Sequence, residues 1–136
     1  MSSTTCDDLG KFLLRLTIGI LILLHGVSKL SSGVGWLQGM LASQGWPAFF
    51  AWGVYLGEVL APILIILGVY TRAGAALIAI NMLFAIGLAH SNEIFAISKT
   101  GGWAIELQGL FLFGSIAIML LGAGRLSLGG NGARWN

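Results

Sequence analysis

One stretch of the chain decides its architecture, and it reads PAFFAWGVYLGEVLAPILIILGVYTR from residue 47 to residue 72. Before the closing Arg72 it holds a single charged side chain, Glu58. A helix that crosses a bilayer needs about 20 mainly apolar residues, which this stretch supplies from Pro47 to Tyr70. By the same measure, three more segments qualify: residues 12–30, 73–90 and 103–123. We therefore predict an all-α integral membrane four-helix bundle, with residues 1–136 forming a single membrane domain.

The composition agrees with this prediction. Of 136 residues, 57% are hydrophobic and 9% are charged, whereas soluble domains carry about 25% charged residues. A small soluble core could not bury so many apolar side chains, so the lipid bilayer is the expected partner. The net charge of +2 gives no reason to expect nucleic-acid binding, and the single cysteine makes a thiolate metal site unexpected.

The basic residues predict the orientation of the spans. The side that holds both termini carries Lys11, Arg15, Arg72, Arg125 and Arg134, and the other side carries Lys29 and Lys99. The positive-inside rule then places both termini in the cytoplasm, as in a multi-pass protein of the cytoplasmic (inner) membrane. We expect Arg15 to snorkel toward that interface together with Lys11.

The connections between the spans also follow from the sequence. The second and third spans are joined by a very short link, placed at Thr71 and Arg72. The first outer loop is longer, and it carries Trp36, Leu37, Met40 and Leu41 on one helical face. This pattern predicts a short helix lying in the membrane interface. No A-x-A-like cleavage site follows the first span, so we expect it to be retained.

Ionisable side chains inside the spans are the main functional signal. Each costs at least about 2.5–3.5 kcal/mol at the bilayer centre, so such residues are functional candidates by default. Glu58 lies about 16 Å below the outer end of its span. His25 and Lys29 share a face of the first span, because residues i and i+4 stack. Glu106 opens the fourth span on the same outer side, and His90 ends the third span at its rim.

Pro62 makes Glu58 the sharpest candidate. Proline has no N–H to donate to the Glu58 carbonyl four residues earlier, so a kink is expected there. We assign catalytic roles to Glu58 and His25, and ligand binding to His25, Lys29, Glu58 and Glu106. The structural alternatives stay open: Glu58 could simply pair with His25 or Lys29, and a glutamate such as Glu106 is favourable at any helix N-terminus.

The remaining polar residues predict little chemistry. His25 and His90 lie on different spans but at different depths, so they are not expected to bind a haem between them. Asn81 is more typical of hydrogen bonding between helices. We predict no bound metal.

Several motifs together resemble the DoxX family of small membrane proteins. They are LLRL at residues 13–16, LHGVSKL at 24–30, GE at 57–58, LGVYTR at 67–72 and GAGRLSL at 122–128. Family members commonly have an aspartate after the last motif, where this chain has Gly129. The resemblance covers residues 13–128 and carries over seven motif residues: Arg15, His25, Gly26, Lys29, Glu58, Gly68 and Arg72.

The resemblance implies a four-helix protein of a bacterial or archaeal inner membrane. The family is named after a subunit of a thiosulfate:quinone oxidoreductase, and other members are associated with redox stress. The leading hypothesis is therefore a membrane subunit of an oxidoreductase that binds a quinone-like ligand near His25, Lys29 and Glu58. Electrons would then come from a redox partner protein. The sequence does not decide whether the chain is itself an enzyme.

Two other hypotheses stay open at this stage. One is a small, proton-coupled transporter or channel, most easily formed between the protomers of a homo-oligomer because four helices enclose little volume. The other is a non-catalytic membrane scaffold or assembly factor, in which the polar cluster is structural.

Overall fold

The structure, a computed structural model, describes residues 2–136 as helices joined by loops. The order of elements is α1 (Ser3–Ser32), α2 (Gly35–Ser43), the 3₁₀ helix η1 (Ala48–Gly53), the π-helical η2 (Leu56–Leu60), α3 (Ala61–Leu67), α4 (Thr71–Ala89), η3 (Ser91–Glu93) and α5 (Glu106–Leu121). Within this range, β-pairing is confined to an isolated bridge between Ile97 and Trp103. The predicted all-helical class is confirmed.

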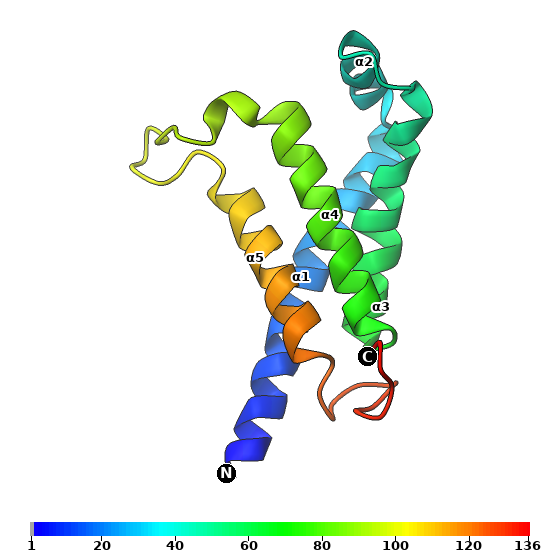
Figure 1. Cartoon of the computed structure of the whole chain (residues 1–136), viewed down its shortest axis with the longest axis vertical. Helices are drawn as coiled ribbons and strands as arrows, with labels where there is room; N and C mark the ends of the chain where they lie inside the picture. Colours follow the sequence, from blue (N-terminus) through cyan, green and yellow to red (C-terminus); the bar gives the residue numbers. More distant parts are fainter. Residues whose placement is uncertain (1) are drawn as a thin grey trace.

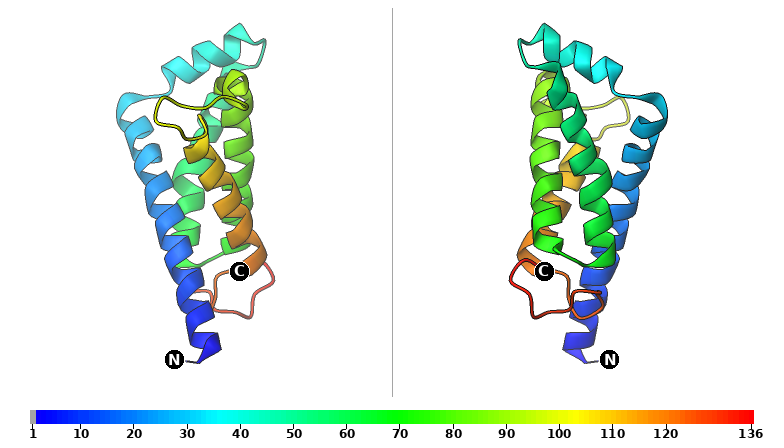
Figure 2. Two further views of the ribbon diagram at one scale, coloured as in Figure 1. Left: turned by 90° about the vertical axis from the view of Figure 1, so that its left-hand side faces the viewer. Right: turned by 90° about the vertical axis from the view of Figure 1, so that its right-hand side faces the viewer.

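The helices α1, α3, α4 and α5 lie side by side and alternate in direction along the chain (Figures 1 and 2). Both chain termini lie at one end, where α3 and α5 finish and α4 begins. We call this the basal end. The opposite end, which α2 covers, is the apical end.

Three helical segments within residues 2–136 are long and apolar enough to cross a membrane: Ser3–Ser32, Ala48–Leu67 and Thr71–Ala89. The first begins earlier than predicted, because the Ser2 hydroxyl accepts a hydrogen bond from the Thr5 N–H and caps α1. α5 is apolar but has 16 residues, fewer than the predicted 103–123. It ends at Gly122, whose φ of 78° takes the chain out of the helix.

The second predicted span is helical but irregular. It starts as the 3₁₀ helix η1, passes through the π turn η2 and becomes α-helical only at Ala61. The Ala61 N–H donates to the Leu56 carbonyl five residues earlier, which is π geometry. Pro62 comes next and has no N–H to continue an α-helical ladder back toward Glu58. The predicted disturbance at Pro62 thus takes the form of a π turn that contains Glu58.

The hairpin between the second and third spans lies slightly earlier than predicted. Thr71 and Arg72 already belong to α4, so the link is formed by residues 68–70. Gly68 ends α3 with φ 73° and ψ 41°, a left-handed conformation that glycine adopts without strain. A Cβ there would lie 2.3 Å from the Ser127 Cβ, so the close approach of the chain also requires glycine.

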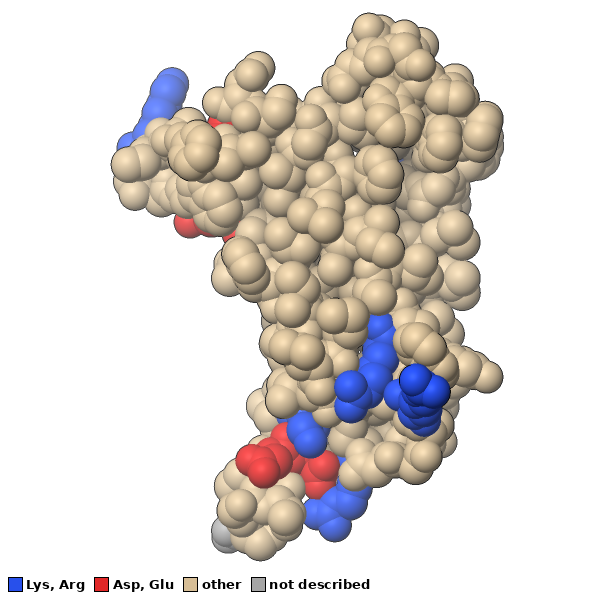
Figure 3. Space-filling model, viewed as in Figure 1, with Lys and Arg blue, Asp and Glu red and all other residues tan. Residues whose placement is uncertain are grey.

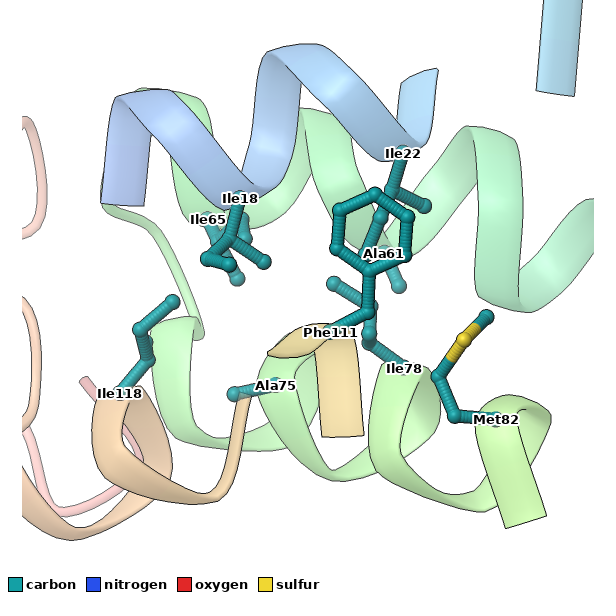
Figure 4. Packing of buried hydrophobic residues seen from close by; sticks show 9 residues of the cluster. All are labelled: Ile18, Ile22, Ala61, Ile65, Ala75, Ile78, Met82, Phe111 and Ile118. Atoms are coloured by element: carbon teal, nitrogen blue, oxygen red, sulfur yellow. The ribbon is translucent and has the colours of Figure 1, made fainter. Parts of the chain in front are cut away.

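The core lies at the middle of the bundle and is built from small and branched side chains of all four helices (Figure 4). Gly74 lets α3 and α4 approach closely, since a Cβ there would lie 3.0 Å from the Ala61 carbonyl oxygen, and Ile22 of α1 and Phe111 of α5 complete the core. Lipid offers little hydrophobic reward for helix association, so such close van der Waals packing is what holds membrane helices together.

A second, smaller core joins α2 to the apical end. Leu41 of α2 is buried against Ala51 and Val54 of the second span, and Val34 packs with them. The predicted helix around Trp36 and Leu41 is therefore present. Its placement in a membrane interface stays a prediction.

Arg15 does not snorkel, and this prediction was wrong. Its side chain is 1% exposed and lies between the basal ends of α3 and α5. Nε donates to the Ile65 carbonyl, and Nη2 donates to Ile66 and Leu126. Nη1 donates to Ala123 and Leu126. The last carbonyls of a helix lack partners within it, so Arg15 supplies donors to the end of α3, at Ile65 and Ile66. It also supplies donors to the loop that follows α5, at Ala123 and Leu126.

Replacing Arg15 tests this arrangement. A lysine keeps the charge but has a compact ammonium group with three donors, so Arg15→Lys should lower the free energy of unfolding by about 3 kcal/mol. Chemical unfolding in detergent micelles, followed by circular dichroism, measures the change. Lys11→Gln on the same helix is the control and should stay close to wild type. Equal stability of Arg15→Lys and wild type would contradict the role given to the guanidinium.

Candidate functional site

Glu58 is buried in the apical half of the bundle and is held by two other segments. The residue is 4% exposed, and its carboxylate forms an ion pair with Lys29 Nζ of α1. The other carboxylate oxygen accepts a hydrogen bond of 3.1 Å from Asn81 Nδ2 of α4. We call Lys29, Glu58 and Asn81 the polar triad. It joins α1, η2 and α4 at one point.

The backbone around Glu58 explains why the carboxylate reaches both partners. Gly26 of α1 lies directly against the Glu58 carbonyl: a Cβ on Gly26 would come within 2.1 Å of that oxygen. The absence of a side chain at residue 26 therefore lets α1 touch the π turn. Lys29 follows Gly26 by nearly one helical turn and so reaches the carboxylate. Tyr55 also donates from its hydroxyl to the Lys29 carbonyl at 3.2 Å.

The electrostatics of the polar triad are balanced. One negative and one positive charge face each other where little water reaches them, and an amide donor meets the second carboxylate oxygen. Removing one member of a buried ion pair leaves an uncompensated charge, which is far more destabilising than removing both. The sequence alternative in which Glu58 pairs with Lys29 is the arrangement observed.

His25 lies near the polar triad without hydrogen-bonding to it. Its Nδ1 is 2.8 Å from the Leu21 carbonyl, so this nitrogen carries a hydrogen and donates. Its ring meets Phe111 edge-on, with centroids 5.7 Å apart. The Nε2 atom of His25 has no hydrogen-bond partner among the described residues and could accept a hydrogen bond from a ligand.

A cavity of about 350 Å³ connects these residues. Lys29, Glu58 and Asn81 line one part of it, and His25 another. Its apical wall is aromatic, with Trp36 of α2, Trp46 and Phe50 among the lining residues. A mainly apolar pocket of this size with a few convergent polar groups is typical of sites for small organic ligands.

His90 and Gln108 also line the cavity. His90 Nε2 is 3.2 Å from Gln108 Nε2, and His90 Nδ1 is 2.8 Å from Glu93 Oε2. An amide nitrogen only donates, so His90 accepts at Nε2 and donates to Glu93 at Nδ1. The sequence placed His90 at the rim of its span but did not indicate that it contacts the cavity.

Glu106 is not brought to the other predicted site residues. It is the first residue of α5, and its carboxylate lies over Gly102, where a Cβ would meet Oε2 at 2.6 Å. It does not line the cavity. Its position in the first turn of a helix favours a negative charge on dipole grounds alone. Its predicted role in ligand binding has no support from this arrangement.

The residues that the sequence missed belong mostly to the cavity wall. The sequence places Trp36 on a helix in the membrane interface and assigns Trp46 no role in a site. In the structure α2 folds over the apical end, and both tryptophans line the cavity. The only signal for this was the apolar face shared by Leu37 and Leu41 of α2, which showed that the helix packs but not where.

Among residues 2–136, no group of three or more histidine, cysteine, aspartate or glutamate side chains is arranged to hold a metal ion. The polar side chains of the cavity are instead one amine, one carboxylate, two amides and two imidazoles, in an apolar surround. Such a set suits hydrogen bonding to an organic ligand.

The fold and the site together define a helical membrane protein with a buried polar triad beside an apolar cavity. Comparison with known proteins identifies the family: the DoxX family model matches residues 10–91, and the chain belongs to this family. The matched region contains His25, Lys29, Glu58 and Asn81, whereas Glu106 and Gln108 lie beyond it.

Two relatives show the extent of the similarity. "Putative oxidoreductase CatD" of Bacillus subtilis is 30% identical over 121 residues, which cover 89% of this chain and 85% of that protein. An uncharacterized protein of Haemophilus influenzae is 29% identical over 119 residues, covering 85% of this chain and 84% of the relative. No solved structure gives a significant match.

The contact between Gly26 and the π turn can be tested by adding a methyl group. Gly26→Ala should destabilise the protein by about 1–3 kcal/mol, because the backbone carbonyl of Glu58 must move. Gly10→Ala in the same helix is the matched control, since no atom lies within 4 Å of its added Cβ. It should be neutral or stabilise by up to about 1 kcal/mol. Equal effects of the two substitutions on the unfolding free energy would refute the close contact.

A double-mutant cycle tests the ion pair. Lys29→Met and Glu58→Gln should each destabilise the protein, and the double variant should be more stable than the sum of the two effects by about 2 kcal/mol. The physical reason is that the double variant leaves no buried charge unpaired. Unfolding free energies of the four proteins in one detergent give the coupling. Additive effects would show that the pair contributes no coupling.

Proposed function

We propose that this protein is a membrane subunit of an oxidoreductase system and binds a quinone-like ligand in the cavity between the polar triad and the apical aromatic wall. The observation that carries the proposal is the cavity itself, which is apolar and aromatic except for a few convergent donors. The name of the Bacillus subtilis relative, an oxidoreductase, supports the reaction class.

The chemistry of the cavity suits a flat ring with carbonyl groups. Lys29 has three N–H donors and gives one to Glu58, and Asn81 has two and gives one to the same carboxylate. Each therefore keeps at least one donor for a carbonyl oxygen. Trp46 and Phe50 meet edge to face with centroids 5.7 Å apart, and they give the ring an aromatic surface to contact.

A quinone bound there would accept two electrons and two protons to become a quinol. Glu58 would relay the two protons one after the other, each time taking up a proton from the surroundings and passing it to the ligand. Lys29 would balance the charge of the carboxylate whenever it is ionised. The apolar lining would keep water from competing for these donors. We assign the electron donor to a redox partner protein.

We also propose that all four helices cross the cytoplasmic membrane of a bacterium or archaeon, with both termini in the cytoplasm. α5 packs along α4 and returns the chain to the basal end, where both termini lie. That path requires an even number of crossings. Arg72 at the start of α4 and Arg125 after α5 belong to the basal end. Figure 3 shows Lys and Arg side chains gathered there, in keeping with the positive-inside rule.

One observation favours a second candidate, a membrane scaffold. Among the described residues, no buried side-chain nitrogen or oxygen atom lacks a hydrogen-bond partner. Glu58, Lys29 and Asn81 therefore each have a partner within the triad without a ligand, as in a purely structural cluster. In that case substitutions in the triad would reduce stability and recovery of a partner protein together.

Quinone binding can be measured through the tryptophans of the cavity. A short-chain ubiquinone or menaquinone analogue should quench the fluorescence of the protein in nanodiscs saturably, because Trp36 and Trp46 line the site. Asn81→Leu, which removes one donor, should weaken binding about tenfold, equivalent to the loss of one hydrogen bond of about 1.4 kcal/mol.

Glu106→Gln provides the control, since Glu106 is ionisable but lies outside the cavity. Its binding should equal that of the wild type. Equal loss in Asn81→Leu and Glu106→Gln would move the site away from the cavity. No saturable quenching by either quinone, with a stable and folded protein, would reject the proposal in favour of the scaffold.

A further inference from the structure

A second hollow lies at the basal end, on the outside of the bundle. Its volume is about 320 Å³, and it lies between the beginning of α4, the end of α5 and the segment that follows. The residues lining it are Arg72, Ala76, Met119, Leu120, Arg134 and Trp135. It shares no residue with the cavity beside the polar triad.

Two guanidinium groups face this basal hollow, and no acidic residue lines it. Arg72 Nη1 donates to the Met119 carbonyl at 3.1 Å, which fixes the side chain against the end of α5. The Arg72 backbone N–H donates to the Trp135 carbonyl at 2.9 Å, which keeps the segment with Arg134 alongside. Within residues 2–136, Arg134 is exposed and makes no side-chain hydrogen bond or ion pair.

The acidic side chains of this end do not neutralise the two arginines. Asp8 of α1 is engaged by Arg125, through the Arg125 backbone N–H at 3.1 Å and its guanidinium. Among the described residues, its neighbour Asp7 is exposed and forms no ion pair with either arginine. Figure 3 shows Lys and Arg side chains gathered at the basal end, with acidic side chains among them on the side of the N-terminus, and an uncharged middle of the molecule. The basal hollow therefore has an uncompensated positive charge.

The lining of the basal hollow changes character along the helix axis. Ala76 lies one turn from Arg72 toward the middle of the bundle, and Met119 and Leu120 belong to the apolar last turn of α5. Leu120 is 69% exposed, so this apolar wall is open to the lipid. Trp135 is exposed at the charged end, and tryptophan is enriched at the level of lipid headgroups.

From this arrangement we propose that the basal hollow binds an anionic phospholipid. Its phosphate lies between Arg72 and Arg134, and an acyl chain runs along Ala76, Met119 and Leu120. Basic pockets between transmembrane helices recognise anionic headgroups in this way, and guanidinium groups match phosphate with paired N–H donors. A free phosphate ion would use the arginines but would leave the exposed apolar wall without a partner, which is why we assign a lipid.

Native mass spectrometry of the full chain tests the assignment, with phosphatidylglycerol compared with phosphatidylcholine of the same acyl chains. The wild type should retain phosphatidylglycerol preferentially. Arg134→Gln should weaken that binding about fivefold, and Arg134→Lys should keep most of it. Arg134 supports no other contact, so these variants should fold, which circular dichroism checks. Lys11→Gln removes one positive charge from the same end but outside the basal hollow, and its retention should match wild type.

Three results would overturn the proposal. The first is equal retention of the two lipids by the wild type. The second is an equal loss in Lys11→Gln and Arg134→Gln, which would mean that general charge attraction, and not the basal hollow, holds the lipid. The third is complete displacement of the lipid by millimolar inorganic phosphate, which would make a soluble anion the occupant. None of these outcomes depends on quinone binding in the other cavity.

Discussion

The guanidinium of Arg15 is the contact on which the arrangement of the helices depends. α3 and the chain after α5 both leave carbonyl groups without partners at the basal end, in surroundings where water cannot replace them. The five N–H donors of Arg15 meet these carbonyls, and its charge lies at the negative end of the α3 dipole. A buried arginine without a carboxylate partner is thus compensated by backbone alone. The end of α3 and the loop after α5 are joined through α1.

The same helix makes a contact in the apical half of the bundle through a second, partly buried cation. Lys29 of α1 meets Glu58 of η2, and Asn81 of α4 completes the triad. α1 is therefore anchored at two depths, by a guanidinium to carbonyls and by an ammonium to a carboxylate. Each contact limits the rotation and sliding of α1. The position of the part of the cavity that α1 lines therefore depends on the contacts of both Arg15 and Lys29.

Much of this could be predicted from the sequence, but not the choice of partners. Placing a charge in lipid costs free energy, and this cost identified Lys29 and Glu58 as candidates from the sequence. Which residues contact them depends on helix packing, which the hydrophobic periodicity of the sequence does not predict. Arg15 stands one turn from Lys11, a position that favours snorkelling. The carbonyls that accept its hydrogen bonds belong to the end of α3 and to the loop after α5, which only the fold brings together. The sequence places Glu106 on the same outer side as Glu58, but in the structure its carboxylate lies over Gly102 and outside the cavity.

The π turn at Glu58 also has a consequence for how the second span can vary. It holds more residues per turn than an α-helix, so the segment before it is out of angular phase with α3. Deleting one residue between Leu56 and Leu60 would close the ladder into an α-helix and rotate everything upstream by about 100°. After such a deletion, Trp46 and Phe50 would no longer line the cavity, whereas α3 would keep its core contacts. The length of this span is therefore constrained by angle as well as by the thickness of the bilayer.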